Sequence, residues 1–163
     1  MYLYARKYVS EHGYERNVNG QIERVESTDV QDIIEPQFPA ELNKFADWKQ
    51  GYIMMQIGYW RKANQIHSWF VENVQGGEDD CREYRVDRDE LQSLFDTVEK
   101  VLMYRTEEMA LEELPPAQGF FFGSNEIDEW YWEQLQYTHD MLKNILDTVP
   151  ENAEIAFVYT SSW

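Results

Sequence analysis

The sequence predicts an α+β fold with three principal helices, the first long and central, packed on a small antiparallel sheet formed by the N- and C-terminal strands. Alternating apolar residues occur near both ends of the chain, helical periodicity fills much of the interval between them, and turn residues separate these segments. Of the 163 residues, 43% are hydrophobic and 15% are aromatic, which suits one core and a single domain over 1–163.

Residues 1–40 are expected to form a strand, a hairpin and a long surface connection. Residues 2–9 alternate and are rich in Tyr and Val, which is typical of a strand. The Asn19-Gly20 pair stands between two short alternating runs, and such a pair predicts a two-residue hairpin turn. Residues 26–40 are polar and contain two prolines, so a surface connection is expected there.

The clearest predicted element is a central helix over 48–75. Apolar residues recur there at spacings of three and four, in two parallel stripes. A helix of roughly 25 residues at 1.5 Å per residue is about 38 Å long, enough to touch most of the other elements. The Gly76-Gly77 pair is expected to end it.

Two further long helices and a short acidic one are predicted. Asp87 begins the first of them, because Glu90 three residues later completes a capping-box pattern. The acidic segment 106–114 predicts a short helix that stops before two prolines. Ser124 or Asn125 is the expected N-cap of the last helix.

In the region 87–148, we expect these helices to surround an aromatic segment that is bounded by glycines. Phe120, Phe121 and Phe122 lie in that segment, which predicts either a buried strand or the aromatic lip of a binding cleft. Residues 153–160 alternate and predict the C-terminal strand.

The charge balance and the cysteine count exclude several classes of function. The chain has 31 Asp and Glu residues against 14 Lys and Arg residues, a net charge of −17. This acidity argues against direct binding to nucleic acid or to an anionic membrane. Cys81 is the only cysteine, so neither an intrachain disulfide nor a multi-cysteine zinc site is expected.

No sequence motif indicates a metal, a cofactor or a location outside the cell. The three histidines lack metal-ligand spacing, and no phosphate-binding loop or nucleophile elbow is present. No apolar run approaches the roughly 18 residues of a membrane span. The first residues also lack a secretory signal. We therefore expect a cytoplasmic protein.

Two polar residues, Asn64 and His67, occupy apolar-stripe positions of the predicted central helix. A polar side chain at a buried seam costs a few kcal/mol (~2–7) unless it is hydrogen-bonded. They form either a hydrogen-bonded core pair or the floor of a ligand pocket with a charged rim. The pocket candidates are Tyr59, Trp60, Arg61, Asn64, His67, Phe120, Phe121 and Phe122.

The C-terminal third is both acidic and aromatic. Residues 106–163 contain twelve carboxylates against one basic residue, Lys143, a net charge of −11. Three consecutive aromatic residues at 130–132 point about 100° apart on a helix and cannot all face one core. They indicate either an exposed protein-binding ring or a helix packed between two layers. The partner-surface candidates are Glu126, Asp128, Glu129, Trp130, Tyr131, Trp132 and Glu133.

Several blocks of the sequence are similar to a family of small, uncharacterised accessory proteins of bacteriophages and prophages. The matching blocks are YWRKANQIHSWFVENVQ (59–75), DDC (79–81), GFFFGS (119–124), DEWY (128–131) and SSW (161–163). The resemblance starts at Tyr59 and assigns no catalytic residue. The resemblance implies a phage-borne protein, located in the host-cell cytoplasm if a phage encodes it. Such proteins commonly interfere with host defences.

The leading hypothesis is a non-enzymatic protein that binds a basic host protein through its acidic, aromatic C-terminal surface. The target is expected to be a host defence or nucleic-acid enzyme that the protein inhibits. The alternative is a protein that sequesters a nucleotide signal in the Trp60, Asn64 and His67 pocket, with Arg61 supplying positive charge. An enzyme with His67 and nearby carboxylates as acid and base is a third hypothesis, and self-association stays open.

Overall fold

The computed structural model describes residues 1–11, 14–25, 33–117 and 125–162. Within these ranges the fold is α+β, with five α-helices, four of them substantial, and a four-strand antiparallel sheet that includes the N- and C-terminal strands. The chain forms two compact units. Unit 1 comprises Met1–Ala5 and Met55–Trp163, and unit 2 comprises Arg6–Met54.

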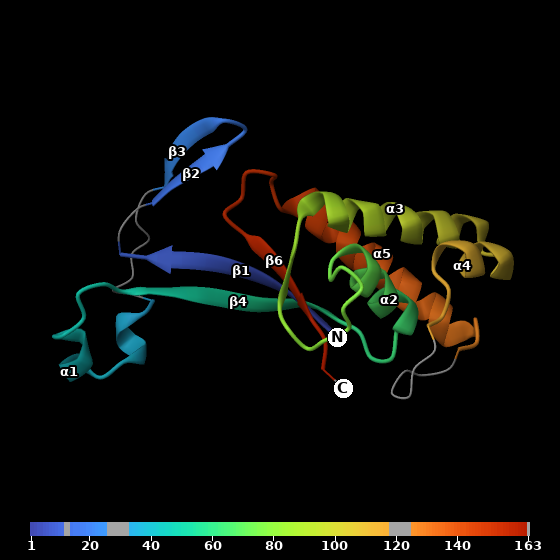
Figure 1. Cartoon of the computed structure of the whole chain (residues 1–163), viewed down its shortest axis with the longest axis horizontal. Coiled ribbons are helices and arrows are strands. Elements are labelled where there is room, and N and C mark those ends of the chain that lie inside the picture. The colour runs from blue at the N-terminus through green and yellow to red at the C-terminus, as the bar shows by residue number, and fades with distance from the viewer. Residues whose placement is uncertain (12–13, 26–32, 118–124, 163) are drawn as a thin grey trace. The chain divides into compact units, whose positions relative to one another are not determined.

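The sheet has the strand order β4-β1-β6-β5 (Figure 1). The order from one edge to the other is β4 (Gln50–Tyr59), β1 (Tyr2–Ser10), β6 (Ala156–Thr160) and β5 (Tyr84–Val86). The predicted strands at both chain ends are therefore confirmed, and they lie next to each other in the middle of the sheet. The β5–β6 pair is antiparallel, with Arg85 opposite Val158.

Four helices accompany the sheet in unit 1. They are α2 (Asn64–Asn73), α3 (Arg88–Tyr104), α4 (Glu107–Glu113) and α5 (Glu129–Thr148). The long helices α3 and α5 pack against each other (Figure 1). The apolar side chains of each recur every three or four residues, so one face of each helix is buried. The buried aliphatic residues are Leu91, Leu94, Val98 and Val101 of α3 and Leu135, Leu142 and Ile145 of α5.

Short-range capping signals were largely correct. Asp87 and Glu90 form the predicted capping box of α3. The last helix is a correction: Asp128, and neither Ser124 nor Asn125, caps α5 by accepting the Tyr131 amide at 3.0 Å. Asp128 has the extended backbone that an N-cap requires. Ser124 lies outside the described residues.

The other end of α5 is held from α3. The Arg88 guanidinium, in the first turn of α3, donates hydrogen bonds to the carbonyls of Leu146 and Val149, each at 2.6 Å. A cation placed on the last carbonyls of a helix also interacts favourably with the helix dipole. This contact fixes the C-terminal end of α5 to the N-terminal end of α3.

The predicted central helix over 48–75 is wrong. Its first part is strand β4, its second part is α2, and Lys62 stands between them with a left-handed backbone, φ 62°. The apolar residues of 50–59 fit a spacing of two as well as a spacing of three and four. Pairing with β1 and the low helix propensity of Gly51 and Gly58 favour the strand.

The hairpin of unit 2 is confirmed. Strands β2 (Tyr14–Val18) and β3 (Gln21–Val25) pair antiparallel, with Val18 opposite Gln21. The two turn residues Asn19 and Gly20 have φ values of 52° and 84°, as a type I′ turn requires. The Gly20 amide donates to the Asn17 side chain at 2.8 Å.

A short helical segment lies in the described part of the expected surface connection 26–40, and a second one begins at its last residue. They are η1 (Glu35–Gln37) and α1 (Ala40–Asn43). Residues 26–32 of the same connection lie outside the described residues. So does the aromatic segment with Phe120, Phe121 and Phe122, whose predicted strand is not tested.

Gly58 provides a test of the packing between β4 and α5. A Cβ atom at Gly58 would lie 2.6 Å from the Met141 sulfur and 3.2 Å from the Leu3 Cβ. We expect Gly58→Ala to lower the free energy of unfolding by about 1–3 kcal/mol, because such overpacking forces side chains to shift. Urea denaturation measures this change.

Gly51 in the same strand is the matched control. A Cβ atom there meets only Ile34, at an ordinary 3.5 Å. We expect Gly51→Ala to change the free energy of unfolding by about 0.5 kcal/mol or less. Equal losses in the two variants would contradict the proposed close approach at Gly58.

Candidate functional site

The structure brings three of the predicted pocket residues together but buries them. Trp60, Asn64 and His67 are at most 3% exposed, whereas Tyr59 and Arg61 are exposed. The Trp60 indole N–H donates to the Thr138 hydroxyl of α5 at 2.8 Å. These contacts resemble the interior of a core. The three phenylalanines of the candidate pocket lie outside the described residues, so the pocket itself stays a prediction.

Both ring nitrogens of His67 have hydrogen-bond partners. The Nε2 atom lies 2.9 Å from the Asp79 carboxylate and the Nδ1 atom lies 2.6 Å from the Tyr159 hydroxyl. A carboxylate can only accept a hydrogen bond, so Nε2 carries the proton and donates it. The Nδ1 atom is then the acceptor for the Tyr159 O–H group. A neutral imidazole satisfies all three groups.

Burial determines the protonation of this network. It lowers the pKa of His67 despite the opposing effect of the Asp79 carboxylate, and it raises the pKa of Tyr159. The Tyr159 ring is fully buried and stacks on Phe70 of α2, with ring centroids 3.9 Å apart. Water and substrate cannot reach its hydroxyl in this conformation. The geometry supports the hydrogen-bonded core interpretation and assigns no nucleophile.

The loop that carries Asp79 is held by the C-terminal strand. The Ser161 hydroxyl donates to the Asp80 carbonyl at 3.2 Å, and Arg82 forms ion pairs with Asp80 and Glu78. The third hypothesis groups His67 with nearby carboxylates, Asp79 among them, but no pattern in the sequence connects His67 with Tyr159. The only signal for these contacts was a histidine in an apolar stripe.

Metal ligation and membrane insertion can both be checked in the described residues. Within the described ranges, no group of three His, Cys, Asp or Glu side chains is arranged to hold a metal ion. No helix in that part of the chain is long and apolar enough to cross a bilayer.

The partner-surface candidates lie on and before the first turns of α5. Trp130 is 47% exposed, whereas Tyr131 is buried and its hydroxyl donates to the Leu114 carbonyl at 2.9 Å. Trp132 is half-buried, with the Arg105 guanidinium 5.6 Å from its ring centre. The three consecutive rings therefore have three different environments, and only Trp130 faces solvent broadly. The surrounding acids Glu126, Asp128, Glu129 and Glu133 are all exposed.

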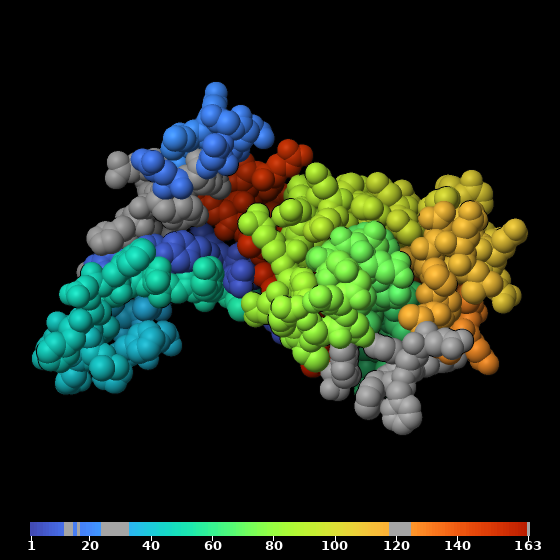
Figure 2. Space-filling view, in the orientation of Figure 1, coloured from blue at the N-terminus to red at the C-terminus, as the bar shows by residue number. Residues whose placement is uncertain are grey.

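The exposed side of α5 combines carboxylates with aromatic rings. At 100° per residue, Glu129, Glu133 and Asp140 fall within about 40° of one another around the helix axis. Trp130 and Tyr137, which is 40% exposed, are seven residues apart and flank this stripe on one side. We call these five residues the acidic-aromatic face of α5. Its N-terminal part lies beside α4 at the surface of unit 1 (Figure 2).

The first two carboxylates of this face, on Glu129 and Glu133, have no cation beside them in the described ranges. Glu129 and Glu133 form no ion pair with any residue in the described ranges, whereas Asp140 accepts from His139 at 2.9 Å. The His139 contact also lowers the pKa of Asp140, so its carboxylate is ionised at neutral pH. The face therefore presents a cluster of negative charge beside two exposed rings.

Comparison with known proteins adds no assignment. No protein-family model matches the chain, and no curated protein or solved structure has significant similarity to it. The resemblance to phage and prophage proteins stays a prediction.

The buried His67 predicts a defined dependence of stability on pH. Its pKa is lower in the folded than in the unfolded chain, so the unfolded chain takes up the proton first as the pH falls. The stability that neutral His67 contributes is therefore present above about pH 6.5 and declines below it, by at most about 1.4 kcal/mol per pH unit. Urea denaturation from pH 7.5 to 5.5 measures the decline.

The variant His67→Gln serves as the reference, because glutamine does not titrate. We expect the free energy of unfolding of the wild type to fall more steeply toward pH 5.5 than that of the variant. Parallel profiles would contradict a neutral, buried His67.

Proposed function

We propose that this protein is a non-enzymatic binding protein that captures a basic protein partner through the acidic-aromatic face of α5. The observation that carries the proposal is the position of two exposed aromatic rings beside a stripe of carboxylates on one helix. Carboxylates attract a basic partner and orient it, and exposed Trp and Tyr side chains supply the desolvated contacts that dominate many interfaces.

The spacing of the charges suits a partner that normally binds a phosphate backbone. Glu129 and Glu133 are one helical turn apart, about 6 Å along the axis. A row of such carboxylates on a rigid helix can occupy the Lys and Arg side chains with which a protein holds nucleic acid. We therefore propose a host nucleic-acid or defence enzyme as the partner class, inhibited by competition for its basic surface.

Glutamine substitutions in the face test the electrostatic part of the proposal. We expect Glu129→Gln/Glu133→Gln to weaken binding to a short Arg- and Lys-rich peptide by about 2- to 30-fold, because two contacts worth roughly 0.2–1 kcal/mol each are lost. Fluorescence anisotropy at low salt measures the dissociation constant, and added NaCl should weaken wild-type binding steeply.

A control with the same net charge separates a defined face from diffuse attraction. Asp147, which is paired with Lys143 at 3.3 Å, lies in the last turn of α5, Glu151 lies just beyond that helix, and both are exposed. At about 0.1 M NaCl, Asp147→Asn/Glu151→Gln should leave the affinity within about 2-fold of wild type, since screening then limits the reach of these charges to roughly 10 Å. Equal losses in the two double variants would count against the face.

The exposed Trp130 tests the aromatic part. We expect Trp130→Ala to weaken peptide binding by about 10-fold, as truncation of a central aromatic contact does. Tyr104→Ala is the control, because Tyr104 is 56% exposed but belongs to α3. Neither variant should shift the midpoint of thermal unfolding appreciably, and an unchanged affinity for Trp130→Ala would remove the ring from the proposal.

A further inference from the structure

Few apolar side chains are buried in the part of unit 2 whose burial the structure describes. Outside residues 12–14, 16 and 24–32, Val9 is the one apolar side chain of this unit that is buried. Large apolar side chains are instead exposed to solvent in this unit, and Phe45 is 83% exposed. A small unit that leaves its apolar side chains outside gains little stability from burial. A surface that covered these side chains would add stability.

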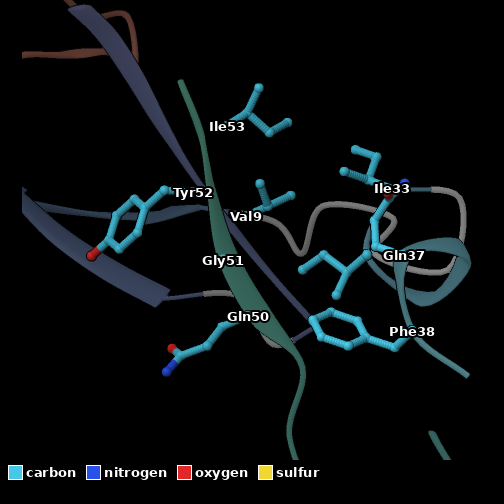
Figure 3. Close-up of a pocket in the computed structure, with 9 residues that line it drawn as sticks. Val9, Ile33, Gln37, Phe38, Gln50, Gly51, Tyr52 and Ile53 are labelled. Carbon is cyan, nitrogen blue, oxygen red and sulfur yellow. The ribbon is translucent and has the colours of Figure 1, made fainter. Parts of the chain in front are cut away.

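The exposed side chains surround a pocket of about 400 Å³. Val9 of β1 and Ile53 of β4 lie on one side, and Ile33 and Phe38 lie across from them (Figure 3). Among the residues that the structure describes, no charged side chain lines this pocket. Such a lining accepts an apolar group and gives no recognition to an ionic one.

A second pocket of about 230 Å³ continues the same surface. The two pockets share Ile34, Phe38 and Gln50 in their walls, and the second extends to Leu42 and Trp48. Its one charged lining residue, Lys49, is paired with Glu35. We call Phe38, Leu42, Trp48 and Ile53 the apolar face of unit 2; all four are 44–58% exposed.

The charge of unit 2 allows two copies of the chain to meet at this face. Residues 6–54 contain nine carboxylates and six Lys or Arg residues, a net charge of −3, whereas the remainder of the chain carries −14. Copies that met through the strongly acidic remainder would repel each other. Contact through unit 2 avoids most of that repulsion.

Unit 2 has a protruding aromatic ring, Phe45, close to its second apolar pocket. Phe45 lies in the turn directly after α1, where its amide bonds to the Leu42 carbonyl at 3.1 Å. It projects into solvent within the stretch of chain that lines the second pocket, between Leu42 and Trp48. A two-fold contact requires a surface that complements itself, and a protruding ring beside an apolar pocket fulfils that requirement.

The exposed aromatic side chains of unit 2 supply about half of the area that a dimer needs. At about 200 Å² for an aromatic side chain, Phe38, Phe45 and Trp48 together expose roughly 400 Å², half of the approximately 800 Å² that each partner buries in a typical interface. Leu42 and Ile53 add aliphatic surface to it.

From these observations we propose that the apolar face of unit 2 is a self-association surface and that its occupant is a second copy of this chain. In the dimer, Phe45 of each copy inserts into the apolar pocket of the other. The contact is apolar, so added salt does not weaken it. This separates the proposal from the salt-sensitive binding at α5, and either can fail without the other.

Analytical ultracentrifugation of the full chain tests the proposal. We expect twice the monomer mass at micromolar concentration, at both low and high NaCl. Leu42→Glu should raise the dissociation constant of the dimer by about 100-fold or more, because it places a carboxylate without a partner in an apolar contact. The matched control is Leu111→Glu on α4, because Leu111 is 52% exposed and Leu42 is 58% exposed. We expect the Leu111→Glu variant to stay dimeric.

Phe45→Ser keeps the test decisive if Leu42→Glu disturbs unit 2. The Phe45 side chain is almost wholly in solvent, so its loss does not remove a contact of the folded monomer. We expect this variant to be monomeric with an unchanged circular dichroism spectrum. A monomeric wild type, or equal dissociation of the Leu42 and Leu111 variants, would overturn the proposal.

Discussion

The stacking of Tyr159 on Phe70 is the contact on which the arrangement of unit 1 depends. It joins the C-terminal strand to α2 with two parallel rings, 11° apart in orientation, at van der Waals distance. The Tyr159 hydroxyl then reaches His67, and His67 reaches Asp79. One side chain of β6 therefore fixes both a helix and the loop after it. Removing the hydroxyl would leave a buried acceptor on His67 without a donor, which is costly in a low-dielectric interior.

In unit 1 the buried polar side chains and the exposed ones differ in charge. The two buried members of the network are neutral, because His67 carries a single ring proton and Tyr159 keeps its own, whereas the Asp79 carboxylate is partly exposed. The ionised carboxylates of the C-terminal third lie outside it, and ten of the twelve are exposed. A neutral core tolerates such an acidic exterior only if the acids are hydrated or meet a basic surface. This is the physical reason that we place the binding activity at α5 and not at His67.

The sequence pattern predicted most turns and caps correctly, but it did not predict structure that depends on contacts between distant residues. The Asn19-Gly20 turn and the Asp87 cap of α3 depend on neighbours within four residues, so the pattern alone determines them. The segment 50–59 was mistaken for helix because its apolar residues satisfy both periods, and only pairing with β1 decides between them. The trio of His67, Asp79 and Tyr159 spans 92 residues of sequence, and no spacing rule connects them. Exposure of Phe45 and the pocket near it follow from how unit 2 folds and left no trace in the residue pattern.

Solution NMR offers the most direct test of where a basic partner binds. A titration of the ¹⁵N-labelled protein with the Arg- and Lys-rich peptide would follow every backbone amide. If the partner binds at α5, we expect the largest changes in amide chemical shift between Glu129 and Asp140. We expect few changes at the apolar residues of unit 2. Changes of similar size at acidic residues throughout the chain, or changes centred on the His67 network, would contradict it.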